Sequence, residues 1–274
     1  MTFRQDLSSR LAQTARQVFW CLFLLTFVVV WTGLWLPLLP EIKGQWLDGL
    51  LLILALAATL TQLARELPGQ NVLQAAIIIS ASSTLVQILG SWTGFKPECF
   101  AIQNTIDSSR WSYWAGPMLW IVLMLTSRGT ARLILSRWRT HPNYGYRLLG
   151  STVGLMLLME LGLQVFATQV RAYWTWAPFG GQRGWHSSLC HFVGFTLIAF
   201  FILLAVTPVL IDKKPHPPQP QSSGADGRLL ALWLMVSVLF LTSLALHQVW
   251  FAAGLTGIGA VVVVLLYLRS AQSP

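Results

Sequence analysis

Eight apolar stretches of bilayer length run along this chain and constrain its fold more than any other feature. A helix needs about 20 predominantly apolar residues to cross the hydrocarbon core of a membrane. We therefore predict an all-α, polytopic transmembrane helical bundle of about eight helices. The fourth stretch is short, and the last two meet at His247 and Gln248 with almost no loop, which leaves a re-entrant hairpin open. The stretches are Val18–Leu39, Trp46–Leu63, Val72–Trp92, Tyr113–Ser127, Leu148–Thr168, Leu189–Ile211, Leu229–Leu246 and Val249–Leu268.

The composition supports a membrane protein and excludes an ordinary soluble domain. Apolar residues make up 55% of the chain and charged residues 10%. Placing the N-terminus inside puts 13 of the 18 basic residues on the cytoplasmic face, counted as 18 less the five at Lys43, Lys96, Arg110, Arg171 and Arg183. The positive-inside rule then predicts that both termini are cytoplasmic, in what we expect to be a bacterial inner (plasma) membrane.

The formal charge of +9 does not indicate nucleic-acid binding, because the basic residues gather in short loops at the ends of the apolar stretches. Anionic lipid headgroups at the cytoplasmic face are the expected partner. The cluster Arg128, Arg132, Arg137 and Arg139 fits a lipid contact and fits topology determination equally well.

Four segments are expected along the chain. Residues 1–17 form a cytoplasmic N-terminal segment, either a short interfacial helix or a plain extension, and residues 18–211 form a six-helix membrane body. Residues 212–228, rich in Pro, Gln, Ser and Gly, are a flexible cytoplasmic linker. Residues 229–268 form a C-terminal transmembrane hairpin with few polar residues, so any chemistry is expected in the body.

Glu160 is the one acidic residue near the middle of an apolar stretch. A charge at that depth costs roughly 2.5 to 3.5 kcal/mol, so such residues usually face the protein interior and a partner. Gln164 and Thr168 follow at intervals of four, which places all three on one helix face. The stripe predicts the lining of a buried cavity, and an interhelical hydrogen-bond clamp is the alternative.

The sequence predicts no metal and no cofactor. Five histidines are too few for a membrane di-iron site, and a mononuclear site from His186, His191 and Glu160 has no diagnostic spacing. His191 or His247 as an axial ligand to a haem or chlorophyll-type pigment is a further alternative to an ordinary hydrogen-bonded histidine. Cys99 and Cys190 both fall near the outer face, where a disulfide would be permitted.

Tryptophans flank the predicted outer loop that follows the Glu160 stretch. Trp174 and Trp176, with Trp185 further on, would form either an aromatic rim that admits a flat or polyene ligand from the lipid, or an interfacial belt.

From Glu160 to Phe195 the sequence resembles the integral-membrane carotenoid biosynthesis family that includes carotenoid hydratases acting on bacterioruberin precursors and gamma-carotene-type ends. The shared features are an acidic residue before a leucine-rich turn, a Trp-x-Trp and an aromatic start to the next helix, and the resemblance extends over roughly Gly94 to Pro215. The matching residues here are Glu160, Leu161, Leu163, Phe166, Ala167, Trp174, Trp176, Trp185, Phe192 and Gly194.

The sequence departs from that family at several positions. The second acid of the family is Gln164 here, its proline is Val165, its asparagine is His191 and its tryptophan is Phe195. The resemblance implies catalytic roles for Glu160, Gln164 and His191. It also implies that a carotenoid or other polyene lipid is bound by Trp174, Trp176, Trp185, Phe192 and Phe195.

The resemblance implies hydration of a terminal C=C bond by acid-catalysed addition of water. A carboxyl kept from water retains its proton more readily, so Glu160 would protonate the alkene while aromatic faces stabilise the cation. Gln164 can orient water but cannot accept its proton, which leaves His191 as the substitute base in this segment. Two other hypotheses are a non-catalytic pigment-binding or accessory subunit of a membrane complex, and a small-molecule carrier, which the scarcity of buried ionisable residues disfavours.

Overall fold

The computed structural model describes residues 2–35, 45–93, 100–101, 108–171, 173, 175–176, 185–211 and 227–272. Side chains are described for residues 12–35, 46–89, 114–171, 173, 191–211 and 227–272.

Over these described ranges the chain forms eight α-helices, and the predicted all-α bundle is confirmed. A π-helical turn, η2 (Phe166–Val170), continues α5, and a short 3-10 turn, η1 (Ser136–Trp138), follows α4. Two-residue strands β1 (Phe100–Ala101) and β2 (Thr175–Trp176) pair antiparallel. The helices are α1 (Thr2–Trp35), α2 (Gln45–Leu63), α3 (Gly69–Thr93), α4 (Ser108–Ile134), α5 (Tyr144–Val165), α6 (Trp185–Val206), α7 (Arg228–Leu246) and α8 (Trp250–Ala271).

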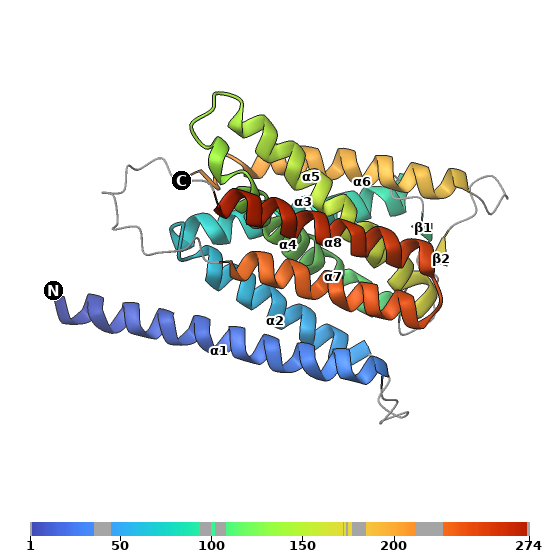
Figure 1. Ribbon diagram of the computed structural model, residues 1–274, viewed down its shortest axis with the longest axis horizontal. Coiled ribbons are helices and arrows are strands. Elements are labelled where there is room, and N and C mark those ends of the chain that lie inside the picture. The colour runs from blue at the N-terminus through green and yellow to red at the C-terminus, as the bar shows by residue number, and fades with distance from the viewer. Residues whose placement is uncertain are drawn as a thin grey trace.

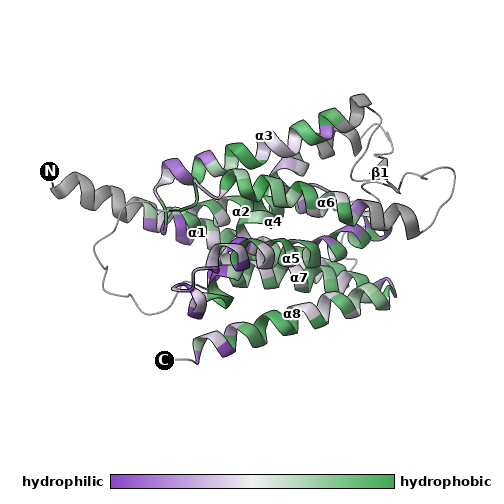
Figure 2. Ribbon diagram, turned by 90° about the horizontal axis from the view of Figure 1, so that it is seen from above, coloured by the Kyte–Doolittle hydropathy of each residue, from purple (hydrophilic) through white to green (hydrophobic). Residues whose placement is uncertain are grey.

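Six helices of the described chain are long and apolar enough to cross a membrane, which makes this a multi-pass membrane protein. Large apolar side chains on the outward faces of α1, α3, α6 and α8 are exposed, as a lipid-facing surface requires. Figure 2 shows hydrophobic residues along most of the helix bodies, with hydrophilic residues concentrated toward the helix ends and connections. The helices run side by side, and both chain termini lie at the same end of the bundle (Figure 1).

Helix α4 is the central helix, and this position explains why its apolar stretch was short. Every residue from Trp120 to Ala131 is buried, and α4 contacts α2, α3, α5, α7 and α8. A helix surrounded by protein can carry polar side chains that a lipid-facing helix cannot, and Thr126 bonds the carbonyl oxygen of Val122 at 2.6 Å. The helix therefore extends beyond the predicted Tyr113–Ser127 at both ends.

The first helix starts at Thr2 and continues without a break through the predicted N-terminal segment. At about 1.5 Å per residue, its 34 residues span about 50 Å, whereas the hydrocarbon core is about 30 Å thick. Figure 1 shows α1 at the edge of the bundle, with its N-terminal part extending past the neighbouring helices.

The C-terminal hairpin is integrated into the body of the bundle. Helix α7 contacts α1, α2, α4 and α5, and α8 packs on α4 and α5. Trp233 and Phe240 of α7 and Val263 of α8 belong to the same hydrophobic core as α4 and α5. The turn between the two helices is tight, and Gln248 adopts a positive φ of 62° there.

Two arginines of the predicted lipid-binding cluster have protein partners. Arg128 is buried, and its Nη2 donates to the carbonyl oxygen of Leu210 at 3.3 Å. Arg132 forms an ion pair with Glu66. Arg137 and Arg139 are exposed at the same end of the bundle, and the headgroup contact stays a prediction that concerns these two side chains.

Close helix packing at Gly259 gives a test of the bundle. A Cβ added there would collide with the side chain of Leu158, because α8 lies directly against α5. We expect Gly259→Ala to lower the free energy of unfolding by about 1 to 3 kcal/mol, the usual cost of overpacking. Gly254→Ala is the matched control, because nothing lies within 4 Å of its Cβ position on the same helix. Thermal unfolding in detergent measures the stability of both variants. Equal stability of the two variants would contradict this packing.

Candidate functional site

A cavity of about 160 Å³ lies among α2, α3, α4, α5, α6 and α7. Its walls are mostly apolar, and aromatic rings come from four elements: Trp120 of α4, Phe166 of η2, Phe195 of α6 and Phe240 of α7. A cavity of about 150 Å³ with apolar walls accepts a benzene-sized molecule. The space therefore suits one end group of a larger apolar ligand. The polar side chains that line it are Asp48, Gln87, Glu160, Gln164, Tyr173 and His191.

Glu160 lies on this cavity and is held by two polar partners. The Nε2 atoms of Gln164 and of His191 both contact Glu160 Oε1, the latter at 3.0 Å. Glu160 is 3% exposed and His191 is 1% exposed. Gln164 lies one helical turn after Glu160 on α5, and His191 comes from the adjacent α6. The structure thus brings together the three residues that the sequence predicted as catalytic.

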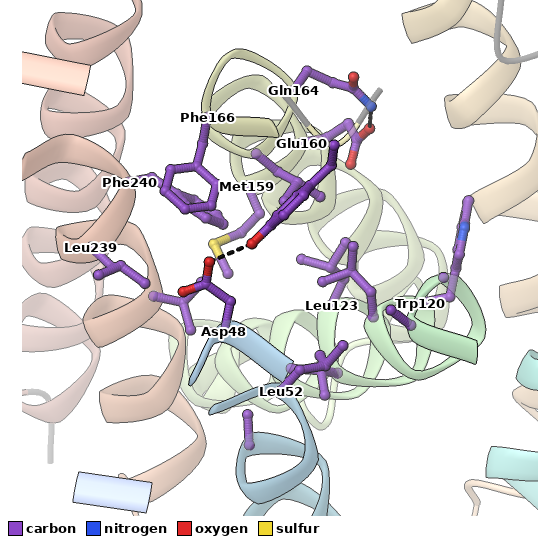
Figure 3. A pocket seen from close by; sticks show the side chains of 18 of the residues that line it. Asp48, Leu52, Trp120, Leu123, Met159, Glu160, Gln164, Phe166, Leu239 and Phe240 are labelled. Atoms are coloured by element: carbon purple, nitrogen blue, oxygen red, sulfur yellow. Dashed lines mark hydrogen bonds between the residues drawn. The ribbon is translucent and has the colours of Figure 1, made fainter. Parts of the chain in front are cut away.

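The geometry leaves one oxygen of Glu160 for a ligand. Both contacts are made to Oε1, and Figure 3 shows the other carboxyl oxygen turned toward the interior of the pocket. A proton on either Glu160 or His191 can be held between Oε1 and Nε2, because a histidine ring nitrogen donates or accepts according to its tautomer. The arrangement can therefore store one proton beside the cavity.

Thr168, the third member of the predicted polar stripe, does not reach the cavity. Its hydroxyl donates to the carbonyl oxygen of Gln164 at 2.7 Å. This bond from a threonine to the preceding helical turn is an ordinary one, and it satisfies the hydroxyl locally.

The π-helical turn η2 shapes part of the cavity wall. The amide of Arg171 donates to the carbonyl oxygen of Phe166 at 3.0 Å, which is the wider spacing of a π-helix. The turn places the Phe166 ring 5.4 Å from Phe240 and returns Tyr173 toward the bundle, where its amide donates to Ala167. Turns of this kind are rare and frequently occur at functional sites.

A second polar cluster on the cavity wall was not predicted from the sequence. Arg171 Nε lies 3.0 Å from Asp48 Oδ2, and Arg171 Nη2 donates to Asp48 Oδ1 at 3.2 Å. The Tyr173 hydroxyl also donates to Asp48 Oδ2. Burial, followed by the adjacent Asp48 carboxylate, raises the pKa of Tyr173, so the phenol keeps its proton and remains a donor.

The predicted aromatic residues divide into three groups. Phe195 lines the cavity, and its ring stacks on Trp120 with centroids 4.7 Å apart. Phe192 packs edge-on against His191 at 5.3 Å and is absent from the described cavity lining. Trp174 and the side chains of Trp176 and Trp185 lie outside the described residues. The aromatic wall that the structure describes consists of Phe195 together with Trp120, Phe166 and Phe240, which were not predicted.

The remaining metal and cysteine candidates lie partly outside the described side chains. Among the side chains that the structure describes, no group of three or more His, Cys, Asp and Glu residues could hold a metal ion. His247 is exposed at the turn after α7, with Nδ1 2.9 Å from the carbonyl oxygen of Ser243. The side chains of His186, Cys99 and Cys190 lie outside the described part of the chain.

The fold and the cavity define a class: a multi-pass helical membrane protein with a buried carboxyl group on an aromatic-walled cavity. No family model, curated protein or solved structure matches the chain.

The contact between His191 and Glu160 makes a prediction about stability. Replacing His191 by Leu leaves a buried carboxyl with one partner fewer, which costs about 1 to 3 kcal/mol. The matched control is His247→Leu, because His247 is exposed, and changes at such positions usually stay within about 0.5 kcal/mol. Thermal unfolding of both variants in detergent measures the difference. If the two variants are equally stable, His191 is not a structural partner of Glu160.

Proposed function

We propose that the cavity binds one end of a carotenoid-type polyene and that the protein adds water to its terminal C=C bond. The observation that carries the proposal is the position of Glu160, which is buried on a cavity with aromatic walls and bonded to His191. Acid-catalysed hydration needs a proton donor away from bulk water, a stabiliser of positive charge and space for one water molecule. The resemblance of the Glu160 to Phe195 segment to carotenoid hydratases agrees with this chemistry.

In the proposed reaction Glu160 delivers its proton to the less substituted alkene carbon, and a tertiary cation forms at the neighbouring carbon. The stacked rings of Trp120 and Phe195 lie on the same cavity, and an aromatic face stabilises a desolvated cation by about 0.5 to 2 kcal/mol. Water then adds to the cation and loses a proton. His191, in contact with Glu160, can exchange a proton with it and restore the acid for another turnover.

A polyene-binding protein without catalysis is the second candidate. The amide of Gln164, which cannot accept a proton, stands beside Glu160 where the resembled family has an acid. In this case Glu160, Gln164 and His191 would form a hydrogen-bonded clamp that rigidifies the wall, and the pigment would be bound unchanged, alone or in a larger membrane complex.

The setting of the proposed reaction is a bacterial inner membrane with both termini in the cytoplasm. The bias of basic residues supports this orientation, as does the location of both termini at one end of the bundle. Glu160, Asp48 and His191 would then lie in the outer half of the membrane, with the exposed Arg137 and Arg139 beside anionic headgroups at the inner face.

Replacing Glu160 by Gln tests the proposed acid. In cells that make an acyclic carotenoid, we expect the intact chain to yield a more polar, hydroxylated pigment, measured by chromatography and absorption. Glu160→Gln should reduce this product by about 100-fold or more, the usual contribution of a positioned acid. Glu66→Gln is the control, because Glu66 lies at the other end of the bundle and pairs with Arg132. If Glu160→Gln leaves hydroxylation unchanged, the proposed mechanism is wrong. If unmodified pigment co-purifies with the intact chain, the second candidate, a polyene-binding protein without catalysis, is favoured.

The close approach of Gly116 and Gln87 tests whether this cavity is the binding site. A Cβ at Gly116 would lie 2.6 Å from Gln87 Nε2, so Gly116→Ala must displace an amide that lines the cavity. We expect less pigment per protein to co-purify with Gly116→Ala. Gly154→Ala should retain the normal amount, because Gly154 is exposed and nothing lies within 4 Å of its Cβ position. Equal retention by both variants would place the pigment elsewhere.

A further inference from the structure

The cavity has a second carboxyl group, Asp48, which comes from α2 rather than from the segment that carries Glu160. Asp48 lies in the first turn of α2, where the partial positive charge of the helix N-terminus favours a carboxylate. It lines the same cavity as Glu160 and forms an ion pair with Arg171. Its side chain is 9% exposed, so few contacts with solvent compete with a molecule inside the cavity.

The contacts of Asp48 leave acceptor capacity on Oδ1. A carboxylate has about four lone-pair sites. Arg171 Nε and the Tyr173 hydroxyl both meet Oδ2, and Arg171 Nη2 meets Oδ1 at 3.2 Å. Oδ1 therefore retains the capacity to accept one further hydrogen bond. The Tyr173 hydroxyl lies at the same place and also lines the cavity.

We infer that Asp48, supported by Tyr173 and Arg171, binds the water molecule that adds to the cation and accepts its proton. The inference rests on the proposed hydration and supplies the base that Gln164 cannot provide. One O–H bond of Glu160 breaks as the new C–H bond forms at the alkene. The water oxygen then bonds to the cationic carbon, and one of its protons passes to Asp48.

The steps balance as the addition of one water molecule to one alkene, with no oxidation or reduction. Water bound to a carbocation is a strong acid, so even a carboxylate paired with an arginine accepts its proton. The proton must then return from Asp48 to Glu160 before another turnover. Acid and base thus come from different helices, α5 and α2, that line one cavity.

Isotope incorporation separates the two steps. The purified chain is incubated with lycopene in D2O that contains D2(18)O. Deuterium in the recovered alkene reports proton delivery and its reversal, and 18O in the product reports capture of water. With the intact chain we expect both labels. Asp48→Asn should keep deuterium incorporation within about threefold while 18O incorporation falls by about 100-fold, a typical contribution of a positioned proton acceptor.

Two further variants distinguish a chemical role of Asp48 from a purely structural one. Tyr173→Phe removes one support of Asp48 but keeps its ion pair with Arg171, and we expect a smaller loss of 18O product with deuterium incorporation unchanged. Asp48→Asn/Arg171→Met removes both charges, which avoids an unpaired buried arginine. If this double variant regains hydration, Asp48 acts only as the partner of Arg171 and the inference fails.

The outcomes distinguish this inference from the proposed function. Glu160→Gln should lose both labels, because no cation forms without the acid. Normal 18O incorporation in Asp48→Asn would overturn the role of Asp48 and leave hydration by Glu160 intact. Absence of both labels with the intact chain would overturn the proposed hydration itself, and the role of Asp48 with it.

Discussion

A bilayer offers no water to a polar side chain, so every carboxyl group within the bundle must be satisfied by the protein. Both acids that line the cavity meet this requirement, in different ways. Glu160 is held by an amide and an imidazole, and Asp48 by a guanidinium and a phenol. The partners from outside α5 come from α6 and from the segment after η2. The hydrogen bonds of the two acids therefore connect α2, α5, α6 and the segment after η2 around the cavity. The cavity is the place where these polar contacts and the apolar packing meet.

The packing of the helices follows from the same constraint. Helix α4 carries polar residues along its length and is enclosed by five other helices, whereas α1 and α8 present apolar faces outward. Because α4 is central, its Trp120 reaches the cavity from one side while Phe240 of α7 reaches it from another (Figure 3). The C-terminal hairpin consequently contributes to the site, although its own sequence is almost entirely apolar.

The fold was predictable from the sequence because membrane-spanning helices can be recognised as long, predominantly apolar stretches. Glu160 was predictable for the related reason that an acid in such a stretch is exceptional, and the spacing to Gln164 identified its neighbour on the helix. Asp48 was harder, because it lies beside the predicted boundary of its stretch, and its partner Arg171 is 123 residues away. The aromatic wall was harder still. Trp120, Phe166 and Phe240 lie in stretches that are apolar on all sides, so no periodicity distinguishes a cavity-facing ring from a lipid-facing one.

The separation of the two acids has a physical advantage for the proposed chemistry. The residue one helical turn after Glu160 is an amide, Gln164, and not a second acid. It donates to Glu160 Oε1, and a donor aimed at an oxygen that becomes negative as the proton leaves stabilises the transition state. A base is then needed elsewhere, and the opposite side of the cavity suits it, because a cation formed between the two groups is attracted to both. The glutamine beside Glu160 and the aspartate on α2 are, in this view, two parts of one arrangement.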